Sequence, residues 1–359
     1  MTNVPRAREL VLQHGWNATA YQIVNPGIEH WFSERGDAVV GFVTRHGVCV
    51  IAGAPVCARE RLEEVLAEWE NYARLKGCKV CYFGAAGRVY NLLSARRAYA
   101  TVVLGAQPVW HPARWPEIVA AHASLRAQLR RAVNKGVSVE EWLPERATQN
   151  PQLKKCLDEW LARRGLPPLH FLVEPQTLDD TQGRRIFVAL RNGTAIGFLT
   201  ASPVPCRRGW LSEQFVRGRD APNGTVELLL DTMMRAVAKD GAEYVTMGLV
   251  PLSQHTSLAP DFNPFWLRML LAWIRAHGRR FYNFDGLDAF KSKFRPQSWE
   301  PIYAISSEPN FSPHSLYAIA AAFSGQPPLR AVMYALFKAA KQEMQWLKSL
   351  EKMQKSTAG

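Results

Sequence analysis

The stretch that decides the fold runs from Arg279 to Ile305 and reads RRFYNFDGLDAFKSKFRPQSWEPIYAI. Its pattern predicts a short strand over residues 281–284, a turn at Asp285-Gly286 and a helical turn that Pro296 stops. Within it, three cations and two aromatic rings fall within six residues: Lys291, Lys293 and Arg295 with Phe290 and Phe294. Because unpaired lysine and arginine are almost never fully buried, we expect these cations to face solvent, a carboxylate or an anionic ligand.

After Pro296, the order of Trp299, Pro301 and Tyr303 predicts an apolar strand. The run from Tyr282 to Ile305 resembles the closing signature of the lysylphosphatidylglycerol synthase C-terminal domain, the catalytic part of the multiple peptide resistance factor proteins. That family carries a similar strand, glycine turn, Lys-x-Lys-Phe and Pro-x-x-Trp-x-Pro order. Three further stretches resemble the same family: APNGTVELLLDTMM at 221–234, YVTMGLVPLS at 244–253 and LRRAVNKGVSVEEW at 129–142.

The resemblance covers most of the chain from about residue 39 to residue 305. It implies a mixed α/β fold of two tandem acetyltransferase-like (GNAT) domains that move an aminoacyl group from a charged tRNA to a lipid hydroxyl. We expect an N-terminal GNAT-like domain at 1–135 with a bridging helix at 115–135. A catalytic GNAT-like domain at 136–310 and a helical basic tail at 311–359 follow. No cofactor is implied.

Composition agrees with two domains and a charged partner. The chain has 359 residues, and its 47% hydrophobic content suffices for real cores. It carries 44 Lys+Arg against 31 Asp+Glu, a formal net charge of +13. Such an excess favours a polyanionic partner, either nucleic acid or an anionic membrane surface, although it says nothing about the fold.

The cysteines predict a reducing compartment. The opening MTNVPRAREL lacks the apolar core of a secretory signal, so we expect reduced thiols in a cytoplasmic protein. Cys78 and Cys81 form a C-x-x-C pair, but no second pair completes a zinc set, and CKVCYF is typical of a buried strand. We therefore expect no metal site.

Membrane contact is left open by the sequence. No apolar run approaches the roughly 18 residues that span a bilayer, so we expect the membrane-embedded half of the resistance factors to be missing here. From Leu329 to Lys352, apolar residues recur every three or four positions with lysines largely off that stripe, as in an amphipathic basic helix. That helix either packs on its own domain or gives peripheral contact with an anionic membrane, at the inner face of the cell membrane.

The first half of the chain predicts a mixed α/β layer after an irregular segment that extends to about Arg35. The expected order is a hairpin turning at Arg45-His46-Gly47, a helix at 59–76, a strand at 79–83, a short helix from Gly87 and a strand at 100–104.

The second half begins with one long helix at 115–135, whose basic face either is solvated or contacts phosphate. The expected order is then a strand at 137–142, a helix at 152–163, strands at 185–190, 195–202 and 209–216, a helix after Gly224 and a strand at 244–250. Asn192-Gly193 is a strong two-residue hairpin turn. This order repeats that of the first half with more strands, yet no repeat is visible in the sequence, so the tandem fold rests partly on the resemblance.

Chemistry is expected where the strand at 209–216 gives way to the helix after Gly224. Backbone amides at a helix N-terminus are unpaired, so this loop can hold an anionic or carbonyl oxygen. Arg219, Asn223 and Gly224 resemble the Arg/Gln-x-x-Gly-x-Gly/Ala loop of acyl-CoA-using GNAT enzymes. Pro222 stands at the first glycine and lacks the amide that a pyrophosphate needs, which disfavours acetyl-CoA.

Glu227 lies three residues into that helix, at the positive end of its dipole. First-turn electrostatics explains a carboxylate there without any function, but the resemblance implies a functional acidic residue near this place. We expect Glu227, Lys291 and Asp285 to be catalytic, and Asp231 is the spare candidate. Asp285 is expected to pair with a cation or to recognise the amino group of the aminoacyl moiety.

Lys293 and Arg295 are expected to contact the terminal phosphates of a tRNA or the developing oxyanion. His255 is the histidine nearest the expected site and either binds substrate or has no function. No Ser-His-Asp or Cys-His arrangement is evident, and an aminoacyl ester needs none, because it is already activated. We predict that Glu227, Lys291 and the two cations that follow it converge on one cleft of the second domain.

The sequence thus predicts an aminoacyl-tRNA-dependent transferase acting on a phosphatidylglycerol-like lipid or another hydroxylated acceptor. Two alternatives remain: an acyl-CoA-dependent N-acyltransferase, and a non-catalytic lipid- or RNA-binding protein with the same fold. Net charge does not separate them. The oligomeric state is not predicted.

Overall fold

The structure, a computed structural model, describes residues 3–164, 168–253, 255, 262–277 and 284–324. The described residues form one 12-stranded mixed sheet, in the order β1-β2-β3-β4-β12-β5-β10-β9-β8-β7-β6, with β11 also paired to β5. The strands are β1 (Glu29–Phe32), β2 (Val39–Arg45), β3 (Val48–Ala52), β4 (Lys79–Ala85), β5 (Ala100–Trp110), β6 (Val137–Trp142), β7 (Arg185–Arg191), β8 (Thr194–Val204), β9 (Gly209–Arg217), β10 (Tyr244–Thr246), β11 (Val250–Pro251) and β12 (Ser298–Ser306).

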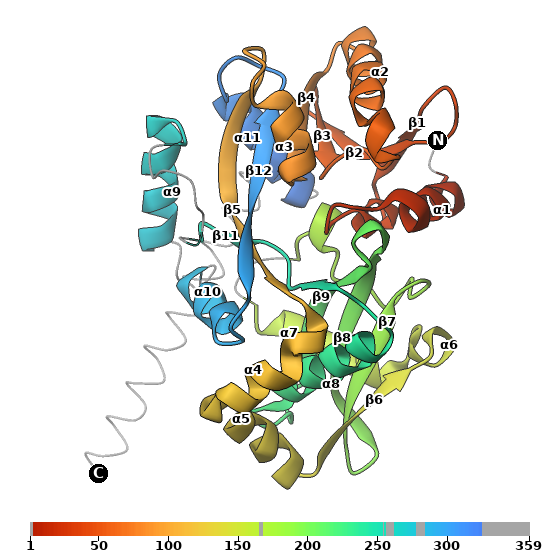
Figure 1. The fold of residues 1–359 in the computed structure, drawn as a ribbon, viewed down its shortest axis with the longest axis vertical. Coiled ribbons are helices and arrows are strands. Elements are labelled where there is room, and N and C mark those ends of the chain that lie inside the picture. The colour runs from red at the N-terminus through yellow and green to blue at the C-terminus, as the bar shows by residue number, and fades with distance from the viewer. Residues whose placement is uncertain (1–2, 165–167, 254, 256–261, 278–283, 325–359) are drawn as a thin grey trace, which may run out of the picture.

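Helices lie on both faces of this sheet (Figure 1). The α-helices are α1 (Val4–His14), α2 (Leu62–Leu75), α3 (Gly87–Leu93), α4 (Trp115–Ala121), α5 (Ala123–Asn134), α6 (Pro144–Ala147), α7 (Pro151–Ala162), α8 (Thr225–Lys239), α9 (Phe265–His277), α10 (Phe284–Ser292) and α11 (Pro313–Ser324). The 3-10 turns are η1 (Tyr21–Val24), η2 (Arg59–Arg61), η3 (Pro112–Arg114), η4 (Phe171–Val173) and η5 (Pro205–Arg207). Within the described ranges, no helix combines the length and apolar character needed to cross a membrane.

The same strand–helix–strand unit occurs in each half of the sheet. In the first half β3 leads through α2 to β4, and β3 and β4 pair in parallel. In the second half β9 leads through α8 to β10, again as a parallel pair. Antiparallel hairpins precede both units, β2–β3 in the first half and β7–β8–β9 in the second. The mixed α/β fold class is therefore confirmed.

Burial on both faces explains why the strands are apolar throughout. In β2, Val39 and Val43 pack into the core beside α1 and α11, whereas Val40 and Phe42 pack into the core beside α2. This alternation follows from side chains pointing to opposite faces along a strand. In the second half, α5 and α8 cover one face and α7 covers the other.

Strand β12 joins the halves, because it hydrogen-bonds to β5 along its whole length and to β4 from Tyr303 to Ser306. In Figure 1, β5 and β12 run side by side from the top of the picture down towards the second half of the sheet. The residues of β12 follow α10 in the chain but complete the sheet of the first half. The division at residue 135 stays a prediction.

Several elements differ from the sequence-based expectation. The segment before Arg35 is not irregular, since it forms α1, η1 and β1. The expected single helix at 115–135 is two helices, separated at His122, whose φ and ψ of −114° and 100° are extended. Asp285 and Gly286 do not form a turn, because they lie within α10, which also includes Phe284. That helix ends at Ser292, four residues before Pro296.

The hairpins, α2, β4, α7, α8 and the strand around Tyr303 are confirmed, with ends that differ by a few residues. The first described part of the expected tail is α11, whose Ala318 and Ile319 lie in the core beside β2 and β3. The predicted helix from Leu329 to Lys352 lies outside the described residues.

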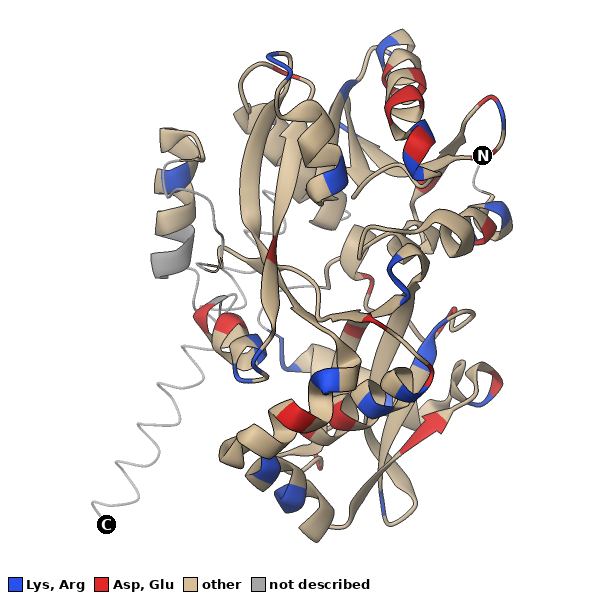
Figure 2. Ribbon diagram, in the orientation of Figure 1, with Lys and Arg blue, Asp and Glu red and all other residues tan. Residues whose placement is uncertain are grey.

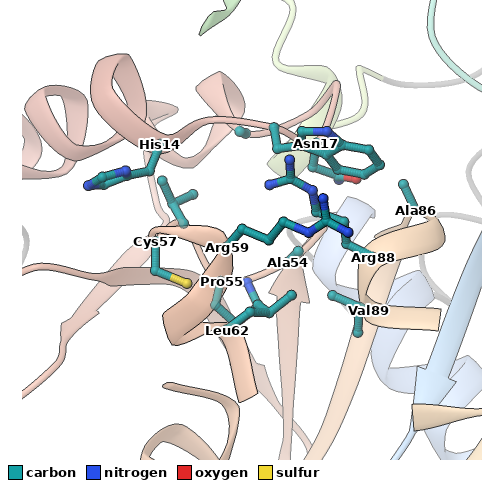
Figure 3. Close-up of a pocket in the computed structure, with 13 residues that line it drawn as sticks. His14, Asn17, Ala54, Pro55, Cys57, Arg59, Leu62, Ala86, Arg88 and Val89 are labelled. Carbon is teal, nitrogen blue, oxygen red and sulfur yellow. The ribbon is translucent and has the colours of Figure 1, made fainter. Parts of the chain in front are cut away.

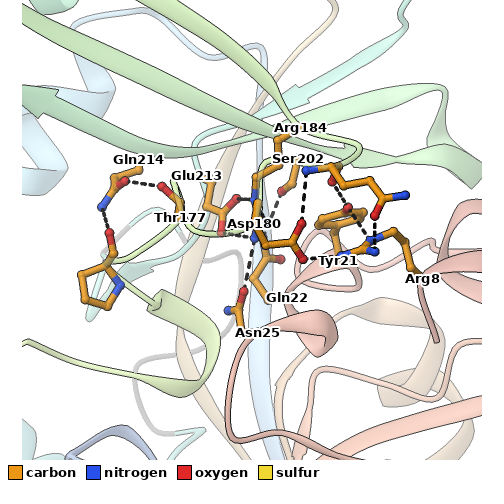
Figure 4. Close-up of polar contacts among 12 residues, drawn as sticks. Arg8, Tyr21, Gln22, Asn25, Thr177, Asp180, Arg184, Ser202, Glu213 and Gln214 are labelled. Carbon is orange, nitrogen blue, oxygen red and sulfur yellow. Dashed lines mark hydrogen bonds and ion pairs between the residues drawn. The ribbon is translucent and has the colours of Figure 1, made fainter. Parts of the chain in front are cut away.

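A buried polar network fastens the N-terminal segment to the second half (Figure 4). Arg184 and Glu213 form a two-pronged ion pair with N–O distances of 2.9 and 3.2 Å, and their side chains are only 2% and 6% exposed. Arg184 also donates to Asn25 Oδ1 at 3.2 Å, and Arg8 of α1 pairs with Asp180. The Arg184–Asn25 and Arg8–Asp180 contacts link residues 159 and 172 positions apart, so they fix the N-terminal segment against the second half.

Removing one partner of this buried pair is expected to destabilise the fold strongly, because the other charge is left buried without compensation. We expect Arg184→Met to lower the free energy of unfolding by about 3–5 kcal/mol. The double variant Arg184→Met/Glu213→Leu should lose clearly less free energy of unfolding, because it leaves neither charge buried alone. Chemical denaturation of the three proteins measures both values.

The matched control is Arg96→Met, which breaks an ion pair with Glu63 whose side chains are 45% and 67% exposed. An exposed pair contributes about 0–1 kcal/mol, so this variant should unfold almost as the parent protein does. Equal losses for Arg96→Met and Arg184→Met would contradict a structural role for the buried pair.

Candidate active site

A pocket of about 290 Å³ lies at the start of α8, between α5 and the end of α10. Five consecutive positions from Pro222 to Val226 form one side of it. Its other lining side chains come from four elements: Gln128 of α5, Arg217 of β9, Glu227 of α8, and Phe290 and Lys293 at the end of α10. Residues about 165 positions apart thus meet at a helix N-terminus, where the first backbone amides have no intrahelical acceptor.

Gly224 is the residue that lets this loop form. Its φ of +96° is left-handed, and a Cβ atom there would lie 2.2 Å from the carbonyl oxygen of Gln128. Any other residue would therefore push α5 away from the loop, besides adopting a costly backbone conformation. Arg217 holds the other end of the loop, since Nε and Nη2 donate to the Ala221 carbonyl at 3.1 and 2.8 Å.

Glu227 and Lys293 form the charged pair of the pocket, with Lys293 Nζ donating to Glu227 Oε1 at 2.7 Å. The Glu227 side chain is 11% exposed and that of Lys293 is 39% exposed. The ammonium also lies 4.3 Å from the ring centroid of Phe290 and 4.9 Å from that of Phe294. Ion pairing and cation–π contacts together hold the ammonium beside the carboxylate while leaving part of it open to a ligand.

Lys291 has a different environment, although it is only two residues from Lys293. It is buried, and Nζ donates to the carbonyls of Met247, Gly248 and Leu249 at 2.6, 3.0 and 3.2 Å. Burial lowers the pKa of Lys291 to about 7. The structure therefore brings Glu227 together with Lys293 in the pocket, while Lys291 holds the segment after β10.

Lys291 supplies donors to carbonyls that lose their strand partner where β9 and β10 stop pairing. Strands β9 and β10 pair in parallel only over Gly209 to Leu211 and Tyr244 to Thr246. Beyond this point β9 continues to Arg217, whereas residues 247–249 leave the sheet before β11 pairs with β5. Backbone carbonyls that lose a strand partner inside a protein must find another donor. An ammonium group has three donors, one for each carbonyl in this segment.

His255 lies beside α10, with its ring stacked on Trp299 at a centroid distance of 4.3 Å. Its Nε2 lies 3.2 Å from Asp288 Oδ1 and 3.3 Å from Ser292 Oγ. A nucleophilic triad needs the carboxylate on one ring nitrogen and the hydroxyl on the other. Here both approach the same nitrogen, so this cluster does not activate Ser292.

Of the remaining predicted residues, Arg219, Arg295 and Asp285 lie outside the pocket lining. Arg219 is exposed, and its backbone amide donates to Glu159 Oε2 at 2.7 Å. Arg295 is exposed just after α10, with a φ of +50°. Asp285 is half-buried in the first turn of α10. Asn223 does line the pocket, and its Oδ1 accepts from Arg217 at 3.2 Å.

Asp231, the spare acidic candidate, has structural partners. Its Oδ1 accepts from Trp115 Nε1 at 2.8 Å, and its Oδ2 pairs with Arg235 Nε at 2.9 Å. These contacts tie α8 to the start of α4. Of the two carboxylates, Glu227 is therefore the one that lines the pocket.

Comparison with known proteins gives a family. The family profile described as "Phosphatidylglycerol lysyltransferase, C-terminal" matches residues 8–306, which is most of the chain. The chain belongs to this family. A phosphatidylglycerol lysyltransferase of Bacillus subtilis is 27% identical over 281 residues, covering 76% of this chain and 31% of that protein. The chain thus spans about a third of the length of this curated relative.

Two solved structures share the fold. L-PGS from Bacillus licheniformis has 20% sequence identity and a TM-score of 0.73, with 94% of this chain and 97% of that chain covered. A C-terminal domain from Agrobacterium fabrum has 23% identity and a TM-score of 0.75, with 90% and 97% covered. The resemblance of the stretch from Tyr282 to Ile305 to this family is therefore confirmed.

For this member of the phosphatidylglycerol lysyltransferase C-terminal family, sequence reasoning missed two residues of the pocket. Arg217 ends a strand directly before the expected loop, and that position was a usable signal. Gln128 carries no local signal, because it reaches the pocket only through the packing of α5 on α8. Pairings between distant helices cannot be found from local periodicity.

The buried position of Lys291 predicts a pH dependence of stability. An unfolded lysine has a pKa of about 10.4, whereas burial brings the folded value to about 7. Between these values the unfolded chain binds a proton that the folded chain does not, so this lysine makes the free energy of unfolding rise with pH. We expect the rise in the parent protein between about pH 7 and 10, and a smaller rise in Lys291→Met.

The measurement is chemical denaturation at intervals of pH for both proteins. Lys293→Met is the control, because it removes a lysine two positions away and leaves Lys291 with its three carbonyls. If the free energies of unfolding of Lys291→Met and the parent differ by a constant amount over this pH range, the three carbonyls keep the ammonium charged. The predicted lowering of the Lys291 pKa would then be absent.

Proposed function

We propose that this chain is an aminoacyltransferase that moves an aminoacyl group from aminoacyl-tRNA to the hydroxyl of phosphatidylglycerol or a similar lipid. The observation that carries the proposal is the Glu227–Lys293 pair, 2.7 Å apart in a pocket at the N-terminus of α8. It lies within a chain that belongs to the phosphatidylglycerol lysyltransferase C-terminal family.

The reaction asks for orientation, a proton acceptor and support for an oxyanion. The acceptor hydroxyl oxygen bonds to the ester carbonyl carbon, and the bond from that carbon to the tRNA ribose oxygen then breaks. Glu227 takes the hydroxyl proton and returns it to the leaving ribose oxygen. Lys293, together with the backbone amides at the start of α8, stabilises the negative charge on the carbonyl oxygen in between.

The shape of the loop favours this donor over acyl-CoA. Pro222 lines the pocket and has no amide to offer a pyrophosphate. Gly224 is buried against the Gln128 carbonyl oxygen, so α5 covers the loop at this point with a group that repels phosphate. An ester carbonyl carries no net charge and does not meet this repulsion.

Helix α5 provides a surface for the tRNA. Gln128, which lines the pocket, is followed at three and seven positions by Arg131 and Lys135, so the three lie along one stripe. Both cations are exposed, and Figure 2 shows basic segments on this helix. Arg130 lies about 200° around the helix from Gln128 and faces away from the pocket.

Transfer of label into lipid tests the function. The purified chain is mixed with radiolabelled aminoacyl-tRNA and phosphatidylglycerol vesicles, and the lipid phase is counted. We expect transfer by the parent protein, and at least about a tenfold loss in Glu227→Gln, equivalent to about 1.4 kcal/mol in the barrier. Lys293→Met should lose a similar amount.

The control variant is Glu117→Gln, which changes an exposed carboxylate of α4 and should transfer at the parent rate. Melting curves confirm that each variant is folded. Undiminished transfer by folded Glu227→Gln would sink its role as proton acceptor, and absence of transfer with every aminoacyl-tRNA and lipid would sink the proposed function.

Charge reversal on α5 separates tRNA binding from chemistry. We expect Arg131→Glu/Lys135→Glu to raise the KM for aminoacyl-tRNA about tenfold at low salt, with little change in the KM for lipid, because phosphate contacts release counterions. Arg130→Glu is the matched control on the same helix and should have a smaller effect. Equal effects of both variants would show that α5 acts only through net charge.

A further inference from the structure

A second, smaller pocket lies in the first half, between the segment after α1, the turn η2 and the start of α3 (Figure 3). Arg59 and Arg88 both point into it, and its floor is apolar, with Leu62 and Val89 buried. Its enclosed volume of about 20 Å³ admits little more than one small group. None of its lining residues belongs to the pocket at α8.

Two arginines line this pocket, Arg59 and Arg88, and Arg88 is held by a cation–π contact. The guanidinium carbon of Arg88 lies 4.3 Å from the ring centroid of Trp16, and that of Arg207 lies 5.0 Å from the same centroid. Arg207 is paired with Glu300 at 2.8 Å. In the described part of the chain, no carboxylate forms an ion pair with Arg59 or Arg88.

No other group in the pocket supplies a negative charge. Burial raises the pKa of the Cys57 thiol in the lining to about 12, so this thiol is neutral near pH 7. Burial lowers the pKa of Arg88, and the neighbouring charges of Arg59 and Arg207 lower it further. The cations therefore repel one another, and a bound anion would relieve that repulsion.

We propose that Arg59 and Arg88 form a binding site for the phosphate group of a small phosphorylated ligand. Two guanidinium forks match the charge and the oxygen geometry of a phosphate monoester dianion. The small enclosed volume limits the buried part of the ligand to that group, and the apolar floor strengthens its attraction to the arginines. Trp16 already contacts the guanidinium groups of Arg88 and Arg207, so it positions Arg88 and does not stack on the ligand.

This inference does not depend on the proposed transfer reaction, and binding alone tests it. The whole chain is titrated calorimetrically at constant ionic strength with inorganic phosphate, glycerol 3-phosphate and adenosine 5′-monophosphate. We expect saturable binding of at least one of them. If free phosphate binds as tightly as both esters, the phosphate group alone is recognised; if one ester binds more tightly, its alcohol part contacts the rim.

Arg59→Gln and Arg88→Gln should each weaken binding at least about tenfold, equivalent to about 1.4 kcal/mol. Arg88→Lys keeps the charge but loses the fork and should lie in between. Arg96→Gln, outside the pocket, and Lys293→Met, in the other pocket, should bind as the parent does. Melting temperatures without ligand show that the variants are folded.

Two results would overturn the proposal. One is the absence of saturable binding for all three ligands by the parent protein. The other is unchanged phosphate binding by folded Arg59→Gln and Arg88→Gln. If Lys293→Met abolishes binding while these two variants still bind, the phosphate occupies the pocket at α8.

Discussion

Strand β12 is the constraint on which the rest of the structure depends. It pairs with β5 from Ser298 to Ser306 and, over its last four residues, with β4 as well. Five residues separate the end of α10 from its first residue. Once β12 is fixed between two strands of the first half, α10 can reach only a small region, and that region lies against the start of α8. The candidate site therefore depends on a sheet whose other strands are distant in sequence.

The second condition for the site is the early separation of β9 and β10. Parallel strands that stop pairing expose carbonyls on both sides of the gap, and a buried carbonyl without a donor costs free energy. Lys291 satisfies three of them on the β10 side. A buried lysine is costly by itself, so its presence here is explained by the carbonyls that it satisfies and not by the need for a charge.

The sequence was most informative where a local rule decides the backbone. Asn192-Gly193 predicted its hairpin because both positions favour positive φ, and the structure has 51° and 74° there. It was less informative at α1, although the signal was present: Asn3 caps the helix, and Ala7, Leu10 and Val11 form its buried face. The register of β12 between β4 and β5 has no local signal, since it depends on pairing across about 200 residues.

The candidate site shows the same division between local and distant information. The cluster of cations and aromatic rings predicted that its cations face solvent, a carboxylate or an anionic ligand. Lys291 is instead buried against three backbone carbonyls, whereas Lys293, just after α10, meets Glu227. Which lysine meets it could not be read locally, because residues two apart on a helix point to different sides. The position of the segment from Met247 to Leu249 decides which lysine does which: Lys291 binds the carbonyls of this segment, and Lys293 pairs with Glu227 in the pocket.

This division affects how the net charge of +13 acts. In the pocket the charge of Lys293 is balanced by Glu227, and Arg217 leaves the lining with a single net positive charge, so the lining itself attracts a polyanion only weakly. Attraction over distance must therefore come from cations on outer faces such as α5. Long-range charge raises the rate of encounter and is weakened by salt, whereas a close ion pair beside apolar rings is screened less. Under the proposed function, cations on outer faces therefore attract the polyanion, and a separate cation in the pocket positions the reacting ester.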